Sequence, residues 1–376
     1  MNIEIVTVDN SGLKETGFGA ISACNSVLAS VRKLGHNARL NVCSTEEHLS
    51  EVAHRKPDLV ILAVKYMSNR DQDDIWLSDY FANKGINFSG SSRHVLKYDS
   101  SKVLAKTHLD KCNVKTAKFF TAIPGQYNSE KSLPINFPLF LKPSDAANGN
   151  GVDDFSLISN FAEFQEKVLS LYSKFGVPVL AEEYLNGREF TVAIIKTAFG
   201  KFIVSAVEII PEESSNGLRI LGERAKRENR EVFSSLDDSE LSWNVRRLAV
   251  EAFKELGIRD FGRIDIKAND RGQCFFVEAN LVPGMTSMSS YFPRACEMAR
   301  GLTYDKVVAL IVDAGIGRVP ATSLIGSESG SPDLVQLPAA WCNQGRIAAA
   351  LSINTRSYCM AGQLPTRTMS QLRSLI

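Results

Sequence analysis

A short segment between residues 261 and 280 constrains the fold of this chain more than any other. Apolar side chains recur at every second residue over 263–268 and again over 275–280, which is the period of a half-buried β-strand. The intervening sequence Asn-Asp-Arg-Gly, at 269–272, has the composition of a tight turn. We therefore predict a β-hairpin with a four-residue loop.

The predicted hairpin gathers polar side chains on one face of a sheet. A four-residue loop would place Asp265 opposite Phe276. It would also place Arg263 opposite Glu278, with Asn280 on the same face. Carboxylate and amide oxygens are the ligands that Mg²⁺ prefers in proteins. The pattern predicts either a magnesium-phosphate site or a solvated outer face of a sheet, where alternating charge is ordinary.

Length and composition indicate an ordinary globular protein of two or three domains. The chain has 376 residues, 44% of them hydrophobic, and a formal net charge of +1. This balance gives no electrostatic reason to expect nucleic acid or a membrane surface as a partner. The seven scattered cysteines include no Cys-x-x-Cys pair, so neither a disulfide framework nor a zinc site is expected. We find no targeting or membrane-spanning pattern and expect a cytoplasmic protein.

Strands alternate with helices through about residue 90, which predicts a doubly wound α/β unit. Residues 2–8 are predicted as a strand and 18–34 as a helix. The run at 59–64 is continuously apolar, which is typical of a central parallel strand covered on both faces. Gly-Phe-Gly at 17–19 hints at a dinucleotide-binding loop, but the third glycine is missing and the sequence does not directly follow the strand.

The middle of the chain predicts a second group of elements. We expect helices near 100–111, 160–175 and 241–256, and strands near 115–121, 138–142, 179–185, 190–196 and 202–209. Beyond about residue 317 the pattern dissolves into Gly, Ser, Pro and Gln, with a weaker segment at the end.

Lys142 ends a predicted buried strand and is followed by a loop of small residues at 144–151. Backbone N–H groups of such a loop can surround phosphate oxygens while the lysine supplies positive charge. Gly149 and Gly151 are equally explained as turn residues. Glu182, at the end of another strand, would ordinarily be solvated. No single one of these features identifies a site.

Several stretches nevertheless follow one another in an order that would rarely arise by chance. They are Gly85-Ile-Asn-Phe-Ser-Gly90-Ser, Asp99-Ser-Ser-Lys102, Phe140-Leu-Lys142-Pro-Ser144 with Gly149-Asn-Gly151, Glu182-Glu-Tyr-Leu-Asn-Gly-Arg-Glu189, Arg263-Ile-Asp265, and Glu278-Ala-Asn280-Leu-Val-Pro-Gly284-Met-Thr-Ser-Met-Ser289. In this order the chain resembles the ATP-grasp superfamily, and within it the D-alanine–D-alanine ligases, over roughly residues 85–316. The last stretch is the most specific.

The resemblance implies an α/β fold class, α+β in the ATP-grasp part. An N-terminal doubly wound domain would occupy residues 1–98. A central ATP-grasp lobe with a glycine-rich lid would follow over 99–186, and a C-terminal lobe with the magnesium site over 187–316. Residues 317–376 would form an extension of uncertain role.

The resemblance also implies ATP and two Mg²⁺ ions as cofactors, with Mn²⁺ as an alternative. The residues implied for ATP are Lys102, Lys142, Gly149, Asn150, Gly151, Glu182, Glu183, Tyr184, Leu185, Glu189 and Lys226. The three lysines would hold phosphates, the glycine loop would close over them, the strand exit would contact adenine and the last glutamate the ribose. The implied metal ligands are Asp265, Glu278 and Asn280, which agrees with the face predicted from the hairpin.

The implied reaction activates a carboxylate with ATP and then joins it to an amine. Attack of one anion on another needs cations that offset the charge. The amine next attacks the acyl phosphate, and the developing oxyanion needs preorganised donors, for which Arg263 and the Gly284 N–H are the candidates. Ser289 would receive the carboxylate of the second substrate. Partners would be small amino acids or other carboxylates, and a second copy of the chain in a homodimer.

Three positions depart from the family's pattern on the substrate side. The stretch around Glu15 replaces a Gly-Gly-x-Ser-x-Glu sequence, so Glu15 is a weak counterpart of its glutamate. Arg227 stands where the family commonly has tyrosine, and Ser289-Ser290 replaces Ser-Leu. Such changes can redirect a pocket to another substrate, because unpaired buried polar groups discriminate strongly.

Four functions therefore stay open. D-alanyl-D-alanine formation is the leading one, followed by formation of a different dipeptide or amide, including one in a secondary pathway. A nucleotide-binding protein that has lost catalysis is a third, although both acids, the asparagine, the arginine and three lysines are retained. An enzyme that stops at the acyl phosphate is the fourth.

Overall fold

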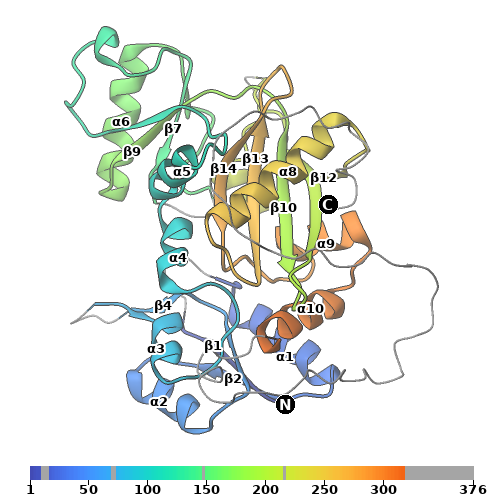
Figure 1. Ribbon diagram of the computed structural model, residues 1–376. Coiled ribbons are helices and arrows are strands. Elements are labelled where there is room, and N and C mark those ends of the chain that lie inside the picture. The colour runs from blue at the N-terminus through green and yellow to red at the C-terminus, as the bar shows by residue number, and fades with distance from the viewer. Residues whose placement is uncertain (10–16, 69–72, 146–148, 215–216, 318–376) are drawn as a thin grey trace, which may run out of the picture. The chain divides into compact units, whose positions relative to one another are not determined.

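The computed structural model describes residues 1–9, 17–68, 73–145, 149–214 and 217–317, and these belong to one compact unit (Figure 1). The predicted extension over 317–376 lies outside the described residues except for Gly317, and so does Glu15. The predicted domain boundaries stay predictions.

The N-terminal region is a parallel sheet covered by helices. Its elements are β1 (Asn2–Thr7), α1 (Ile21–Lys33), β2 (Asn37–Val42), α2 (Glu46–His54), β3 (Leu59–Leu62), β4 (Tyr66–Met67), β5 (Ile75–Trp76) and α3 (Leu77–Asn83). The parallel strands run in the order β2-β1-β3. Ile3 and Ile5 pack with residues of α1, whereas Val6 and Val8 pack with residues of α2 and α3. Both faces are therefore covered, which confirms the predicted doubly wound α/β unit.

The predicted central position of the apolar run at 59–64 is wrong. β1 lies in the middle of the three strands and β3 at one edge. All four residues of β3 are buried, and Val60 makes an isolated parallel bridge to Phe88 beyond that edge. The continuous apolar run thus reflects cover on both faces of the strand, which does not require two full neighbouring strands.

A second, antiparallel sheet follows two helices. The elements are α4 (Arg93–Ser100), α5 (Lys102–Lys111), β6 (Phe119–Ala122), a 3₁₀ turn (Glu130–Ser132), β7 (Leu139–Pro143), β8 (Leu157–Ile158), α6 (Phe161–Phe175) and β9 (Val179–Glu183), with strand order β6-β9-β7-β8. Asn160 Oδ1 accepts the Glu163 N–H at the start of α6, and Gly176, at φ 66°, ends it. Phe164, Val168 and Leu171 of α6 pack on the sheet.

The third sheet carries the predicted hairpin. The elements are β10 (Glu189–Lys196), β11 (Phe202–Ile210), α7 (Glu223–Glu228), β12 (Val232–Ser235), α8 (Glu240–Glu255), β13 (Phe261–Ala268), β14 (Cys274–Asn280), α9 (Tyr291–Arg300) and α10 (Tyr304–Ile316), with strand order β12-β11-β10-β13-β14. Apolar side chains of α8 pack with one face of the sheet, and those of α9 and α10 with the other. Figure 1 shows α8 lying across the strands. The fold class implied by the resemblance is confirmed.

The hairpin forms, but its predicted register is wrong at the polar end. The loop has five residues, 269–273, closed by the Asn269 N–H on the Gln273 oxygen at 3.0 Å. The pairing then shifts between Asp265 and Ile266, a β-bulge that sets Asp265 opposite Glu278. By the same shift Arg263 faces Asn280. The bulge places the two carboxylates directly across from each other.

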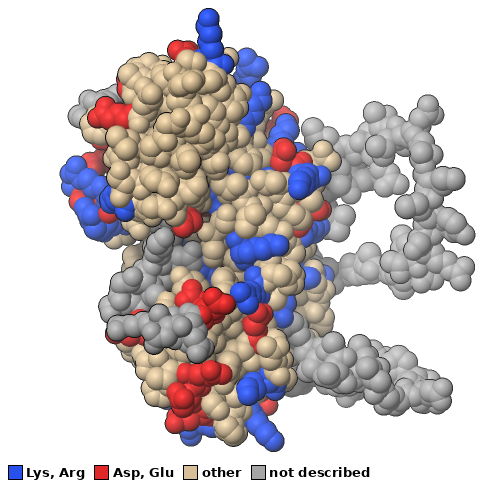
Figure 2. Space-filling model, turned by 90° about the vertical axis from the view of Figure 1, so that its left-hand side faces the viewer, with Lys and Arg blue, Asp and Glu red and all other residues tan. Residues whose placement is uncertain are grey.

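Charge is mixed over the surface that can be seen. On the face drawn in Figure 2, Lys and Arg side chains are dispersed among Asp and Glu, and other residue types cover much of the upper lobe. None of the helices in the described part of the chain combines the length and the apolar character needed to cross a bilayer.

Candidate active site

A cleft between the second and third sheets brings most of the predicted ATP residues together. Its lining includes Lys102, Lys142, Gly149, Asn150, Glu182, Glu183, Tyr184, Leu185, Glu189, Lys226, Asp265 and Glu278. Gly151 and Asn280 do not line it. A Cβ on Gly151 would lie 2.7 Å from the rings of Phe175 and Pro143, so this glycine is required by packing beneath the loop. Its φ of 78° adds to that requirement.

A buried carboxylate shared by two lysines forms one wall of the cleft. Glu182 Oε1 lies 2.6 Å from Lys106 Nζ, and Glu182 Oε2 lies 2.6 Å from Lys142 Nζ. Lys106 is fully buried on α5 and also donates to Thr116 Oγ1 at 2.6 Å. Burial would raise the pKa of Glu182, but the two ammonium groups outweigh it and lower that pKa to about 2. Glu182 therefore holds Lys142 in place, a role that the resemblance, which implied only a contact with adenine, did not predict.

We expect Glu182→Gln to destabilise the protein strongly at neutral pH. The pKa of Glu182 falls from 4.5 to about 2 on folding, a difference worth about 3 kcal/mol. Removing the charge would also leave Lys106 and Lys142 buried without a counterion. Urea unfolding at pH 7 would measure the loss of free energy.

The pH dependence of this loss follows from the direction of the shift. A carboxylate whose pKa is lowered stabilises the fold above its ordinary value, so the difference between the two proteins should shrink as pH falls from 4.5 towards 2. The control is Glu213→Gln, which breaks an exposed ion pair with Arg219 and should change little. Equal unfolding free energies for the two variants at pH 7 would contradict the role of Glu182.

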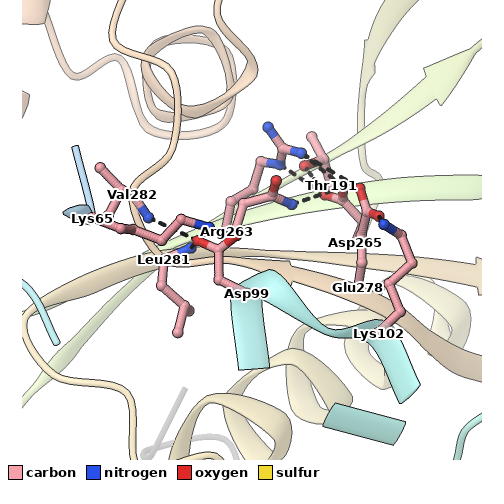
Figure 3. Close-up of polar contacts among 10 residues, drawn as sticks. Lys65, Asp99, Lys102, Thr191, Arg263, Asp265, Glu278, Leu281 and Val282 are labelled. Atoms are coloured by element: carbon pink, nitrogen blue, oxygen red, sulfur yellow. Dashed lines mark hydrogen bonds and ion pairs between the residues drawn. The ribbon is translucent and has the colours of Figure 1, made fainter. Parts of the chain in front are cut away.

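The opposite wall is the polar face of the hairpin, drawn in Figure 3. Arg263 donates from Nε and Nη2 to the two oxygens of Asp265, each at 2.9 Å. Thr191 Oγ1 donates to Asp265 Oδ1 at 2.7 Å, and Asn280 Nδ2 to Asp265 Oδ2 at 3.4 Å. This network selects a functional face over a solvated one, because Asp265 is only 7% exposed.

Glu278 lies at the centre of the positive charges. Lys102 Nζ is 3.5 Å from Glu278 Oε2, and Arg263 Nη2 is 4.0 Å from Oε1. Burial opposes ionisation of Glu278, but Lys102, Lys226, Lys142 and Arg263 together hold its pKa well below the usual range. Burial, with the neighbouring Glu278 charge, raises the pKa of Asp265 despite Arg263. The two facing carboxylates therefore differ in how readily they ionise.

The donor set suits a hard cation. Within the described ranges, no cluster of three or more His, Cys, Asp or Glu side chains offers a metal site. The predicted set differs in kind: two carboxylates, Asp265 and Glu278, face each other across the strands, and the third member, Asn280, is an amide. Such oxygen donors, with several positions left to water and phosphate, fit Mg²⁺. The surplus of nearby cations further favours a polyanion in the same place.

A second hollow adjoins the cleft and holds the residues predicted for chemistry on the substrate. Its lining includes Arg263, Gly284, Ser289, Ser290, Tyr291, Arg227, Phe18 and Gly17. Asn150 and Lys226 line both the hollow and the cleft. A Cβ on Gly284 would lie 2.7 Å from Ser290 Oγ, so the backbone approaches the hollow closely there. The three predicted catalytic residues thus lie together.

The part of the cleft predicted to hold adenine is lined by residues at the end of β9 and the start of β10. Glu183 Oε1 accepts the Lys118 N–H at 2.9 Å, and Tyr184 stacks on Phe140 with ring centroids 6.5 Å apart. Glu189 Oε2 lies 3.1 Å from Lys267 Nζ. Residues 183–185 line the same cleft as the lysines.

Sequence reasoning missed several residues of these walls. Lys106 lies four residues after Lys102, and this spacing on one helix face was the available signal. Tyr291 packs over Arg263, with 5.2 Å between the guanidinium carbon and the ring centroid. Behind it, both oxygens of the buried Glu231 lack a hydrogen-bond partner among the described residues. Nothing in the charged run around Glu231 distinguished it from a solvated loop.

Two antiparallel sheets that enclose a cleft, with buried lysines on one wall and paired carboxylates on the other, define the ATP-grasp class of protein. Residues 112–313 match the family described as D-ala D-ala ligase C-terminus. This match spans more than half of the chain, and the chain belongs to the D-alanine–D-alanine ligase family, a family of ATP-dependent ligases. The resemblance predicted from the sequence is confirmed.

Individual relatives are distant. The D-alanine–D-alanine ligase of Aquifex aeolicus is 26% identical over 289 residues, which cover 76% of this chain and 92% of that protein. A Sinorhizobium fredii protein named Uncharacterized protein y4sG is 26% identical over 250 residues, covering 64% of this chain and 70% of that protein. The crystal structure of the Bacillus anthracis D-alanine–D-alanine ligase complexed with ATP matches with a TM-score of 0.66 at 20% identity, covering 84% and 97% of the chains.

Proposed function

We propose that this protein is an ATP-dependent ligase that joins the carboxylate of one amino acid to the amine of another through an acyl phosphate. One observation carries the proposal. Lys102 and Arg263 lie 3.5 and 4.0 Å from Glu278, which lines a cleft that Lys142 and Lys226 also line and that adjoins a second hollow. The Bacillus anthracis relative of similar fold was solved with ATP, which supports the assignment of the cleft to that nucleotide.

The first step needs opposite charges brought to one point. A carboxylate oxygen of the first substrate attacks the γ-phosphorus, the bond to the β,γ-bridging oxygen breaks, and ADP leaves. Lys102, Lys142 and Lys226 offset the charge on the phosphates. Mg²⁺ held by Asp265, Glu278 and Asn280 would neutralise the phosphate oxygens when bound. Gly149 and Asn150 line the cleft and would keep water from the acyl phosphate.

The second step forms the C–N bond. The amine attacks the acyl carbonyl, the nitrogen loses a proton, and inorganic phosphate leaves with the electrons of the C–O bond. Arg263 and Gly284 line the hollow, and the guanidinium and the Gly284 N–H would donate to the developing oxyanion. Ser289 would hold the carboxylate of the second substrate.

D-alanine is the leading substrate, and a different dipeptide or amide is the alternative. The alternative is supported by Arg227, which lines the hollow and is paired with Glu223 at 3.7 Å, where the family has tyrosine. Ser290, whose Oγ accepts the Thr286 N–H at 2.9 Å, is a second departure. One relative, from Sinorhizobium fredii, is named Uncharacterized protein y4sG rather than as a D-alanine–D-alanine ligase.

Release of ADP in the presence of single and paired D- and L-amino acids tests the function. We expect amino-acid-dependent ADP release and a product whose mass equals that of the two substrates less one water. Tight nucleotide binding without ADP release for any substrate would instead favour a protein that has lost catalysis. Hydroxamate formed with hydroxylamine, but no amide with amine acceptors, would favour an enzyme that stops at the acyl phosphate.

A further inference from the structure

A buried ion pair outside the cleft joins the N-terminal sheet to the strand that carries the candidate metal ligands (Figure 3). Lys65 Nζ lies 3.2 Å from Asp99 Oδ1 and 3.2 Å from Ser100 Oγ. The two charged side chains are only 3% and 13% exposed. Lys65 follows β3, Asp99 lies in the last turn of α4, and neither lines the cleft or the hollow.

The second oxygen of Asp99 holds the end of β14. Asp99 Oδ2 accepts the Leu281 N–H at 2.6 Å and the Val282 N–H at 3.2 Å. These two residues directly follow Asn280, and Glu278 lies two positions before it. Hydrogen bonds to an ionised carboxylate are short and strong. Asp99 therefore fixes the point at which the strand leaves the polar face.

The same carboxylate lies next to the start of α5. Ser101 caps that helix by accepting the Leu104 N–H at 3.3 Å, and Lys102 is its first residue. Lys102 in turn reaches Glu278, with 3.5 Å between Nζ and Oε2. Asp99 is thus tied through the chain to the lysine and through hydrogen bonds to the strand of the glutamate. A shift of Asp99 would change the distance between the two.

Lys65 extends this connection towards the substrate hollow. The exit of β3 holds the loop of Phe18, whose N–H donates to the Ala63 oxygen at 2.8 Å. The Phe18 oxygen then accepts the Met285 N–H at 2.8 Å, next to Gly284. A Cβ on Gly17 would lie 2.0 Å from the Ala63 oxygen, so this approach is close. The exit of β3 therefore contacts the loop lining the hollow directly and reaches the end of the strand that carries the candidate metal ligands through Asp99.

We propose that Lys65 and Asp99 are positioning residues, which set the spacing between Lys102 and the end of β14 and so the geometry of the cation-binding face. The inference rests on the proposed function. If the pair served only to fill space, two apolar residues would serve as well, because a buried ion pair often stabilises a fold no more than apolar residues of similar volume. An apolar residue in place of Asp99 could not accept the hydrogen bonds that the two backbone N–H groups donate to its carboxylate. Burial lowers the pKa of Lys65 and Asp99 opposes this, so the pair depends on both members.

Binding of Mn²⁺ in the presence of ADP tests the proposal, measured by the loss of the electron paramagnetic resonance signal of free Mn²⁺. We expect Lys65→Met to weaken Mn²⁺ binding about tenfold or more, as loss of the residues behind metal ligands does. Asp99→Asn should act in the same direction, because it removes the charge but keeps the shape. Binding of ADP without metal, measured by calorimetry, should change less than about threefold, since the phosphate lysines remain.

Two control variants separate positioning from general damage. Lys65→Arg keeps the cation and should restore most of the Mn²⁺ affinity, and Lys33→Met, which breaks an exposed pair with Asp305, should leave it unchanged. A folded Lys65→Met or Asp99→Asn protein with the Mn²⁺ affinity of the unsubstituted chain would overturn the positioning role. If the unsubstituted chain bound ADP but no Mn²⁺, the proposed function itself would fall, and the positioning role with it.

Discussion

Glu278→Gln should abolish substrate-dependent ADP release, with a loss of about a thousandfold or more. Four cationic side chains hold the pKa of Glu278 far below its usual range despite burial, so it is ionised at neutral pH. Glutamine keeps the shape of the side chain and removes the charge on which a divalent cation depends. Steady-state ADP release at saturating ATP, Mg²⁺ and amino acid measures the effect.

The same substitution should leave nucleotide affinity intact. Removing a negative charge beside Lys102 and Arg263 favours a polyanion, so ADP without metal should bind at least as tightly as before. The matched control is Glu208→Gln, on β11 of the same sheet, which loses an ion pair with Arg188 away from the cleft. Turnover by Glu278→Gln close to that of Glu208→Gln would exclude the metal-binding role.

The hairpin shows how far local pattern reaches in this chain. Alternation placed Arg263, Asp265 and Glu278 on one face correctly, because side-chain direction depends only on the period of the strand. The pairing across the hairpin was wrong, because it depends on where the strand bulges. The β-bulge after Asp265 adds one residue on β14. Phe276 is therefore buried there rather than its two neighbours in sequence, as the alternation predicted, and the predicted alternation holds only from Glu278 onward. The sheet face that carries the polar side chains could be predicted, whereas the residue opposite each of them could not.

Contacts between distant segments were beyond the reach of local pattern. The sequence indicated that Glu182 is a solvated residue at a strand end. In the structure it is buried between Lys106 of α5 and Lys142 of β7. Lys65 and Asp99 lie 34 residues apart, and Asp99 accepts the N–H of a residue that lies 182 positions further along the chain. Such pairs require the relative placement of separate sheets. The hairpin pattern and the family resemblance both supplied the candidate ligands, whereas the residues that hold them came only from the structure.

Arg263→Lys should separate the two chemical steps. Lysine keeps one positive charge but not the planar fork that bonds both oxygens of Asp265 at 2.9 Å. We expect amide formation to fall by about 100- to 1,000-fold, as when a donor to an oxyanion is lost. Acyl phosphate formation should fall less, because Lys102, Lys142 and Lys226 still offset the phosphates. Migration of ¹⁸O from the β,γ-bridge of ATP to a non-bridging position reports that first step by itself.

The control for lost geometry is Arg188→Lys. Arg188 also bonds a carboxylate through Nε and Nη2, at 2.8 and 2.7 Å from the oxygens of Glu208, but this carboxylate lies on β11, on the other side of β10 from the hairpin. Its substitution should cost a little stability and change neither step. If Arg263→Lys lowered isotope migration and amide formation equally, Arg263 would act by holding Asp265 for the first step. A larger loss of amide formation alone assigns its guanidinium to the oxyanion, because only the second step develops one.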